Sequence, residues 1–374
     1  MFPVVQIPAE ASAYERGLCY GCAAAPQIRH SLATYARLFA FCGITWADAR
    51  ARALRYLSVI EALDPALVDE LQGIAKGCGE PLDAILALNC RTEILPPSYL
   101  NGEPHAADAA LAANRAAGIE DWSECTAICV HGSASADGHA WFAQNWDWIG
   151  RQRAALVVLK TVDAAGLAIT TLTEAGMLAK IGVNAEGFAL GLNIVRSLQD
   201  GEEPGLPVHV LLRHLLSCRS VEHARERLQA LGALGFGAAS NIPCADRGGE
   251  VACFEVAPAG WAELQPVNGT IVHTNHFLCE TLLPHQAPMG AFVSSAPRLA
   301  TAEQLASAPR MGFDALQSFL RDESDGYLSI CRGPNPDWPV ESRIESVAGV
   351  IVNAGTGTMW IAPDVPSRVA FTPV

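Results

Sequence analysis

The sequence of 374 residues is poor in basic residues and has no long uncharged apolar run. It contains 25 lysine and arginine residues against 39 aspartate and glutamate residues, which gives a formal net charge of −14 and a pI near 5.1. Proteins that hold phosphate backbones concentrate basic side chains on one face, so no nucleic-acid partner is expected. Without an apolar stretch of about 18 residues, no membrane-spanning helix and no membrane partner are expected.

The N-terminal residues lack a basic leading segment and a long apolar run, so a cytoplasmic protein is expected. Twelve scattered cysteines are too sparse for a disulfide scaffold, and most are expected to be buried small hydrophobes. Cys19 and Cys22 form a lone CxxC pair, with no second pair at zinc-ribbon spacing. The sequence therefore predicts neither a metal nor a cofactor.

Apolar residues make up 50% of the chain, enough for a large core, which excludes disorder as a global description. The first hundred residues have helical periodicity, with an apolar stripe over residues 28–42. Further helical patterns cover residues 46–63, 65–77 and 81–92. Residues 95–121 carry consecutive prolines and small residues, which predicts a surface connection.

From residue 125 onward the apolar period changes to two, which is typical of strands. The expected strands lie within residues 125–132, 139–148, 154–162, 166–176, 187–195, 250–258, 269–276 and 347–363. Two helical patterns, at 208–218 and 220–231, interrupt them. Strands interrupted by paired helices predict a layered α+β fold in which helices cover sheets.

The first two of these strands predict a hairpin. If Gly132 pairs with His139 across the turn, Cys125 faces Trp146, one position from Asp147. The register alone would then make a thiol and a carboxylate neighbours.

Alternation along the second strand places Asn145 and Asp147 on one face and Gln144, Trp146 and Trp148 on the other. By itself this pattern also fits a half-buried hairpin whose aspartate is satisfied by hydrogen bonds.

Seven short strings carry a further signal. They are QGIAKG at 72–77, LNCRTEI at 88–94, ECTAIC at 124–129, QNWDW at 144–148, LTEAG at 172–176, VHTNH at 272–276 and SICR at 329–332. In this order the chain resembles, over most of its length, the acyl-coenzyme A:isopenicillin N acyltransferase family, the self-cleaving cysteine peptidases among the N-terminal nucleophile (Ntn) hydrolases. The resemblance implies a four-layer αββα sandwich preceded by a mostly helical N-terminal segment.

The resemblance also implies a precursor that cleaves itself between Glu124 and Cys125. Residues 1–124, with a linker over about 95–124, would become one subunit. Residues 125–374, the αββα catalytic segment, would become the other subunit of an αβ heterodimer. The scissile bond lies where a flexible connection meets the first strand, and loops are where backbone can be strained.

Self-cleavage would supply a base that the thiol needs. A cysteine thiol has a pKa near 8.5, and a freed α-amino group titrates at about 7.7–8.0. The Cys125 sulfur would attack the Glu124 carbonyl, and water would release the resulting thioester. The freed amine would then take the thiol proton as sulfur attacks a substrate amide, leaving an acyl-enzyme.

The remaining roles are implied by the matching strings. Asp147 would orient the Cys125 amino group or hold a counter-charge, Asn275 would donate its amide to the oxyanion, and Arg332 would balance Asp147 and favour the thiolate. Taken singly, Asn275 also fits a strand cap and Arg332 an ordinary surface cation.

Four further residues are candidate supports. Arg91 and Glu93 could reach the Cys125 neighbourhood from the helical segment, or could form a structural ion pair. His273 and His276 lie three apart on a strand and so point to opposite faces, which disfavours joint metal binding. They are expected to support Asn275.

Two residues depart from the fungal penicillin-forming members. Glu124 stands where those members carry glycine, and Ala127 replaces a hydroxyl residue. The bulky acid removes the backbone freedom of glycine, so cleavage could be slow or could use the Glu124 carboxylate.

The expected function is hydrolysis of a C–N amide bond in an N-acyl or peptide-like small molecule. An acyltransferase of the acyl-coenzyme A:6-aminopenicillanic acid type is the alternative; no basic cluster suited to coenzyme A phosphates stands out. A third interpretation is an uncleaved cysteine-histidine hydrolase with His273 as base. A catalytically silent binding or assembly protein is the interpretation from another class, and it leaves the co-occurrence of the four site residues unexplained.

Overall fold

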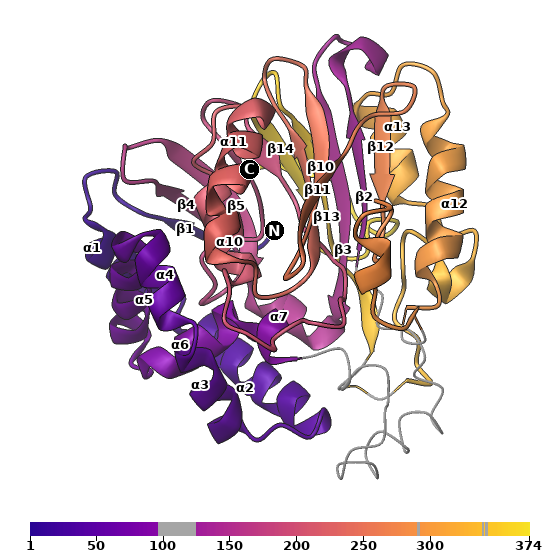
Figure 1. Cartoon of the computed structure of the whole chain (residues 1–374). Helices are drawn as coiled ribbons and strands as arrows, with labels where there is room; N and C mark the ends of the chain where they lie inside the picture. The colour runs from indigo at the N-terminus through magenta and orange to yellow at the C-terminus, as the bar shows by residue number, and fades with distance from the viewer. Residues whose placement is uncertain (96–124, 290–291, 339, 341–342) are drawn as a thin grey trace.

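The alternating patterns after residue 125 fold as two β-sheets stacked face to face, with helices on both outer faces and at one end (Figure 1). The structure is a computed structural model that describes residues 1–95, 125–289, 292–338, 340 and 343–374. The predicted connection over 95–121 lies almost entirely outside the described residues.

The larger sheet has nine strands in the described part of the chain, in the order β1-β4-β5-β6-β7-β9-β10-β11, with β8 paired to β9. Their bounds are β1 Val4–Gln6, β4 Leu156–Val162, β5 Ala168–Glu174, β6 Ile181–Asn184, β7 Ala189–Leu190, β8 Asn193–Ile194, β9 Ser240–Ala245, β10 Val251–Ala257 and β11 Gly260–Leu264.

The smaller sheet has six strands among the described residues, in the order β12-β2-β3-β13-β14-β15. Their bounds are β2 Cys125–Val130, β3 Trp141–Ile149, β12 Thr270–His273, β13 Ile344–Asn353, β14 Thr358–Ala362 and β15 Thr372–Pro373. The predicted hairpin of β2 and β3 therefore lies inside this sheet.

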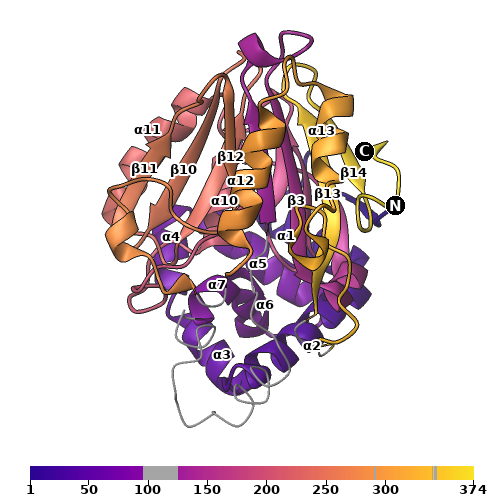
Figure 2. The ribbon, with the colours of Figure 1, turned by 90° about the vertical axis from the view of Figure 1, so that its right-hand side faces the viewer.

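Two pairs of helices form the outer layers. Helices α10 (Val208–Leu215) and α11 (Val221–Leu231) pack on the nine-stranded sheet, while α12 (Ser295–Ala306) and α13 (Phe313–Leu320) pack on the six-stranded sheet (Figures 1 and 2). Separate apolar clusters fill each helix–sheet interface, and another fills the space between the sheets. The expected α+β fold with αββα layers is confirmed. The sequence patterns had indicated α10 and α11 but not α12 and α13.

The N-terminal residues form the helical base of Figure 1. Its helices are α1 Ala13–Ala23, α2 Ala25–Phe41, α3 Trp46–Leu54, α4 Leu57–Leu63, α5 Pro65–Cys78, α6 Leu82–Asn89 and α7 Arg91–Ile94. The pattern over 46–63 is thus two helices rather than one. Short 3-10 helices elsewhere cover Gly132–Ala134, Gly150–Ala155, Gly232–Leu234, Leu283–His285 and Gly326–Leu328.

Close contact between α1 and α5 explains the glycines of the QGIAKG string. A Cβ on Gly73 would lie 2.2 Å from the Tyr14 carbonyl oxygen, and one on Gly77 would lie 2.4 Å from the Leu18 carbonyl oxygen. No side chain fits at those distances, so the string records helix packing rather than chemistry.

The N-terminal segment is not only helical. Strand β1 pairs in parallel with β4, with Val5 opposite Leu159, and so forms an edge of the nine-stranded sheet. Three residues are too short for a period-two pattern, which is why the sequence did not indicate this strand. Among the described residues, no helix is long and apolar enough to cross a membrane.

Candidate active site

The β2–β3 register agrees with the sequence prediction residue for residue. Cys125 pairs with Trp146 and Thr126 pairs with Asn145. Paired residues share a sheet face, so the Cys125 thiol lies on the face of Trp146, and Asp147 points to the opposite face. The carboxylate is therefore a sequence neighbour of the residue opposite the thiol, but it does not share the face of the thiol.

Strand β12 flanks β2 on its other side and brings Asn275 to the same place. His273 pairs with Ala127, and continuing this antiparallel register by two residues puts Asn275 opposite Cys125. A hydrogen bond of 3.2 Å from the Cys125 backbone N–H to Asn275 Oδ1 joins them. The first residue of β2 thus lies between Trp146 and Asn275.

The Cys125 side chain is fully buried and faces the space between the sheets. Cys125, Ala127 and Cys129 belong to the inter-sheet cluster, whereas Ile128 and Val130 pack against α12 and α13. On the same sheet face as the thiol, Lys180 Nζ lies 3.7 Å from the centre of the Trp146 ring. The thiol is therefore buried on a sheet face that also carries Trp146, whose ring is in contact with a buried lysine.

Three hydrogen bonds fix the orientation of the Asn275 amide. Its Oδ1 accepts from Cys125 N–H and from Arg298 Nη2, at 2.7 Å, while its Nδ2 donates to the Ile194 carbonyl at 2.8 Å. Its backbone N–H donates to Ser295 Oγ at 2.8 Å. Because donors face the oxygen and an acceptor faces the nitrogen, only one orientation of the amide satisfies all three hydrogen bonds.

Asp147 and Arg332 come together through a serine. Ser346 Oγ donates to Asp147 Oδ1 at 2.6 Å and accepts from the Arg332 backbone N–H at 2.9 Å. The β3–β13 register shifts between Ser346 and Ala348, opposite Asp147. Such an irregularity re-aims neighbouring side chains, and here it accompanies the contact of the serine hydroxyl with the carboxylate.

The His273 ring lies between Glu255 and the backbone of Thr274, the residue before Asn275. Its Nε2 lies 2.8 Å from Glu255 Oε1, and its Nδ1 lies 2.9 Å from the Thr274 carbonyl. Burial raises the pKa of Glu255, but hydrogen bonds from His273 and from the Leu278 and Cys279 N–H groups outweigh it and hold that pKa below its ordinary value. Both ring nitrogens are thus within hydrogen-bond distance of groups other than the Cys125 thiol. Because these ring contacts are with Glu255 and Thr274 rather than with Cys125, this arrangement gives no support to an uncleaved hydrolase with His273 as base.

His276 also lies beside Asn275. Its Nδ1 is 2.8 Å from Ser295 Oγ, and burial, together with the charges of His273 and Arg298, lowers its pKa to about 4. It is neutral near pH 7. Among the described residues, no group of three or more His, Cys, Asp and Glu side chains is placed to hold a metal.

Arg91 and Glu93 have separate structural contacts. Arg91 lies in a buried ion pair with Glu174, at 3.6 Å, and over the Trp148 ring, at 4.4 Å to its centre. Glu93 Oε1 accepts from the N–H of Val208, the first residue of α10, at 2.8 Å. Arg91 thus joins the helical base to the sheet face of the thiol, and Glu93 caps α10.

Burial raises the pKa of Glu93 to about 7, which makes a prediction for stability. The folded state holds this proton more tightly than the unfolded chain, so stability falls as the pH rises from about 4.5 through 7. The shift corresponds to about 3 kcal/mol. In Glu93→Gln, the difference in unfolding free energy between pH 5 and pH 8, measured with urea, should shrink by most of that amount, since part of the shift lies below pH 5. An unchanged difference would contradict a buried, protonated Glu93.

Glu124, the other side of the predicted scissile bond, lies outside the described residues. Of the predicted site residues within them, the structure brings Cys125 and Asn275 into direct contact, and Asp147 and Arg332 into contact through Ser346.

Sequence reasoning missed Arg298, Ser295 and Ser346. None lies in one of the seven strings, and none has a spacing that marks it. Two belong to α12, whose few large apolar residues gave no helical signal. Only the fold brings Arg298 and Ser295 to the start of β2 and the end of β12, and Ser346 beside Asp147 on β3.

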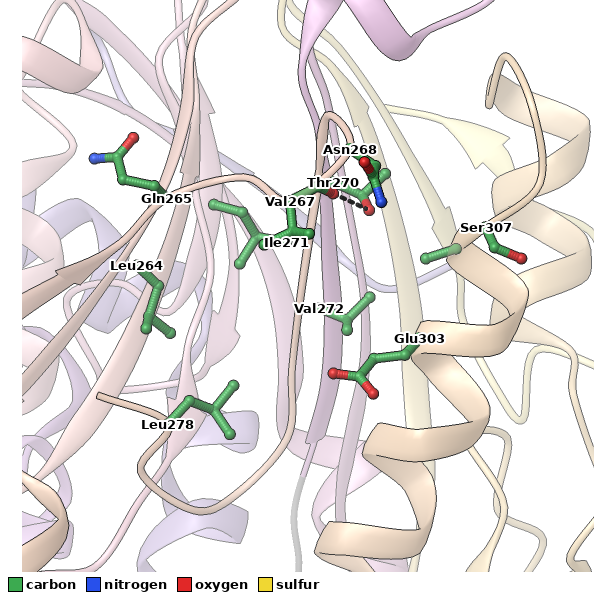
Figure 3. Close-up of a pocket in the computed structure, with 11 residues that line it drawn as sticks. Leu264, Gln265, Val267, Asn268, Thr270, Ile271, Val272, Leu278, Glu303 and Ser307 are labelled. Carbon is green, nitrogen blue, oxygen red and sulfur yellow. Dashed lines mark hydrogen bonds between the residues drawn. The ribbon is translucent and has the colours of Figure 1, made fainter. Parts of the chain in front are cut away.

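The pocket in Figure 3 lies elsewhere. It has a volume of about 340 Å³ and is bounded by α12, by β12 and by residues that flank β12, with Glu303 and Ser307 on the helix side. It is lined by Leu264, Gln265, Val267, Asn268, Thr270, Ile271, Val272, Leu278, Glu303, Ala306 and Ser307. Cys125 and the other predicted catalytic residues are not in this lining.

Comparison with known proteins identifies the family. The profile described as acyl-coenzyme A:6-aminopenicillanic acid acyl-transferase matches residues 134–361, a stretch that contains Asp147, Asn275 and Arg332. The "Acyl-coenzyme A:6-aminopenicillanic-acid-acyltransferase 40 kDa form" of Emericella nidulans is 30% identical over 275 residues, which cover 72% of this chain and 67% of that protein. The chain belongs to this family. The family assignment agrees with the resemblance inferred from the seven strings.

Solved structures are similar at lower levels. A penicillin V acylase from Agrobacterium tumefaciens has 15% identity and a TM-score of 0.40, covering 67% of this chain and 84% of that one. A conjugated bile acid hydrolase variant from Clostridium perfringens has 11% identity and a TM-score of 0.40, covering 67% of this chain and 96% of that one.

Proposed function

We propose that the protein is a self-processing N-terminal cysteine amidohydrolase. It cleaves the C–N amide bond of an N-acyl or peptide-like small molecule through a thioester acyl-enzyme. The observation that carries the proposal is the position of Cys125, which is the first residue of a buried strand and donates its backbone N–H to the side chain of Asn275. Family membership supports acyl-transfer or amide chemistry.

In the processing step, the Cys125 sulfur attacks the carbonyl carbon of Glu124. The C–N bond between the two residues breaks, the nitrogen takes the thiol proton, and a thioester forms. Water hydrolyses the thioester, which leaves a carboxylate on Glu124 and a thiol and α-amine on Cys125.

In turnover, the α-amine takes the thiol proton as sulfur attacks the substrate carbonyl. A hydrogen of Asn275 Nδ2 donates to the resulting oxyanion, and the leaving amine takes the proton as the C–N bond breaks. Asp147, held by Ser346, sets the orientation and charge state of the α-amine, and Arg332 balances the charge of Asp147. Water resolves the acyl-enzyme.

The two products of processing, residues 1–124 and 125–374, would remain an αβ pair. Two observed contacts support this. Strand β1 of the first piece pairs with β4 of the second, and Arg91 is buried against Glu174. Separating the pieces would expose a sheet edge and a buried charge, both of which are unfavourable.

Acyl transfer to an amine is the second candidate, because both the family and the relative from Emericella nidulans are described as acyltransferases. The two activities share the acyl-enzyme and differ in what resolves it. We expect the purified, processed protein, given an N-acyl-p-nitroanilide and millimolar 6-aminopenicillanic acid, to release mainly the free acid. Mass spectrometry of the products measures this partition. A majority of acylated acceptor would establish the transferase instead.

A further inference from the structure

Arg298, on α12, places a fully buried guanidinium at the start of β2. Its Nη1 donates to the Cys125 carbonyl and to Thr126 Oγ1, both at 2.6 Å, and its Nη2 donates to Asn275 Oδ1 at 2.7 Å. Its Nε donates to Ser294 Oγ at 3.1 Å. One side chain therefore contacts the nucleophile residue, the next residue of the strand and the amide opposite the nucleophile.

The α12 N-terminus is joined to the loop of Asn275 by further hydrogen bonds. Ser295 Oγ accepts from the Asn275 backbone N–H, and Thr274 Oγ1 donates to the Ser295 carbonyl at 2.9 Å. These contacts fix the base of the Arg298 side chain relative to the loop that it reaches. The guanidinium is planar and its donors have fixed directions, so it sets the distances between the oxygens that it binds.

Because Arg298 can only donate hydrogen bonds, it also fixes which way the Asn275 amide is turned. A guanidinium has five N–H groups and no acceptor. If the Asn275 amide turned over, its NH₂ would face both Arg298 Nη2 and the Cys125 N–H, and its oxygen would face the Ile194 carbonyl. Three buried hydrogen bonds would be lost, and donors would face donors and an acceptor would face an acceptor. Each such buried mismatch is strongly unfavourable in free energy.

We propose that Arg298 is a positioning residue for the reaction: it holds the Cys125 backbone against Asn275 and keeps the Asn275 Nδ2 turned toward the oxyanion. This inference rests on the proposed function. Arg298 does not touch the substrate in this account; it acts through Asn275 and Cys125. Loss of such positioning lowers the rate of the chemical step more than it lowers substrate binding.

The test compares Arg298→Met and Arg298→Lys in the processed, full-length protein, with p-nitroaniline release from an N-acyl-p-nitroanilide as the readout. We expect Arg298→Met to lower kcat about 10²-fold with KM changed less than about threefold. Arg298→Lys keeps the charge and part of the donor set, and should recover about tenfold of the loss. Thr126→Val, which removes one acceptor while keeping the shape, should lower kcat several-fold and provides the measurement if Arg298→Met does not fold.

Arg227→Met is the matched control. Arg227 also donates to a carbonyl, that of His214 at 2.9 Å, but it lies on α11 in the opposite helical layer. The kcat of the Arg227→Met protein should stay within twofold of wild type. The inference is wrong if Arg298→Met or Thr126→Val keeps wild-type kcat. It is also wrong if Arg298→Lys lowers kcat as much as Arg298→Met does and both losses follow a fall in Tm. Those results leave the proposed function in place, whereas activity in Cys125→Ala would remove the function itself.

Discussion

Cys125→Ala should yield a single unprocessed chain of 374 residues with no measurable amidase activity. The variant has no sulfur to attack the Glu124 carbonyl, so no thioester forms and no α-amine is released. Wild type should give two chains of 124 and 250 residues. Intact-mass spectrometry measures the first effect and p-nitroaniline release the second.

Cys129→Ala is the appropriate control for this variant. Cys129 is a buried thiol on the same face of β2, four residues along, and it belongs to the same inter-sheet cluster. The Cys129→Ala protein should process and turn over like wild type apart from a modest loss of stability. Two chains from Cys125→Ala would show that another group cuts the backbone.

Asn275→Ala should give the second largest effect, a fall of about 10²–10³-fold in kcat, which corresponds to about 2.7–4 kcal/mol of barrier. The substitution removes the Nδ2 donor and also the acceptor of the Cys125 N–H and of Arg298. Asn275→Asp keeps the acceptor and the shape but loses the donor, so it should lose nearly as much kcat. Steady-state kinetics with the anilide substrate measure both variants.

A buried amide elsewhere separates this effect from a loss of packing. Asn184 Nδ2 donates to the Leu216 and Cys218 carbonyls under α10, in the same way that Asn275 donates to a carbonyl. Asn184→Ala should lower Tm and leave kcat of the folded protein near wild type. If Asn275→Asp kept kcat within threefold, Asn275 would not be the oxyanion donor.

Local patterns predicted those parts of the site that depend on local geometry. The connection from Val130 to Trp141 contains a 3-10 helix, but one assumed pair, Gly132 with His139, sets the whole antiparallel register, so the Cys125–Trp146 pair followed from counting back from it. The face of each side chain followed from the period of two. Asn275 could be assigned only through the family strings, because the neighbour of β2 on its other side comes from a distant part of the chain.

Contacts between distant residues could not be predicted in this way. Arg298 is 173 residues from the carbonyl that it binds, and Ser346 is 199 residues from Asp147. A serine or an arginine on an element without a marked pattern is indistinguishable from a surface residue until the layers are assembled. The same reason applies to β1, because its three residues can be recognised as a strand only once they are paired with β4.

The central claim is that the catalyst is made when the backbone nitrogen of position 125 becomes an amine. The most direct measurement is the intact mass of purified, active protein, combined with stoichiometric alkylation of its reactive thiol. The account predicts two chains, with the alkyl group on the N-terminal cysteine of the 250-residue chain. An active preparation consisting of one uncleaved chain would contradict it.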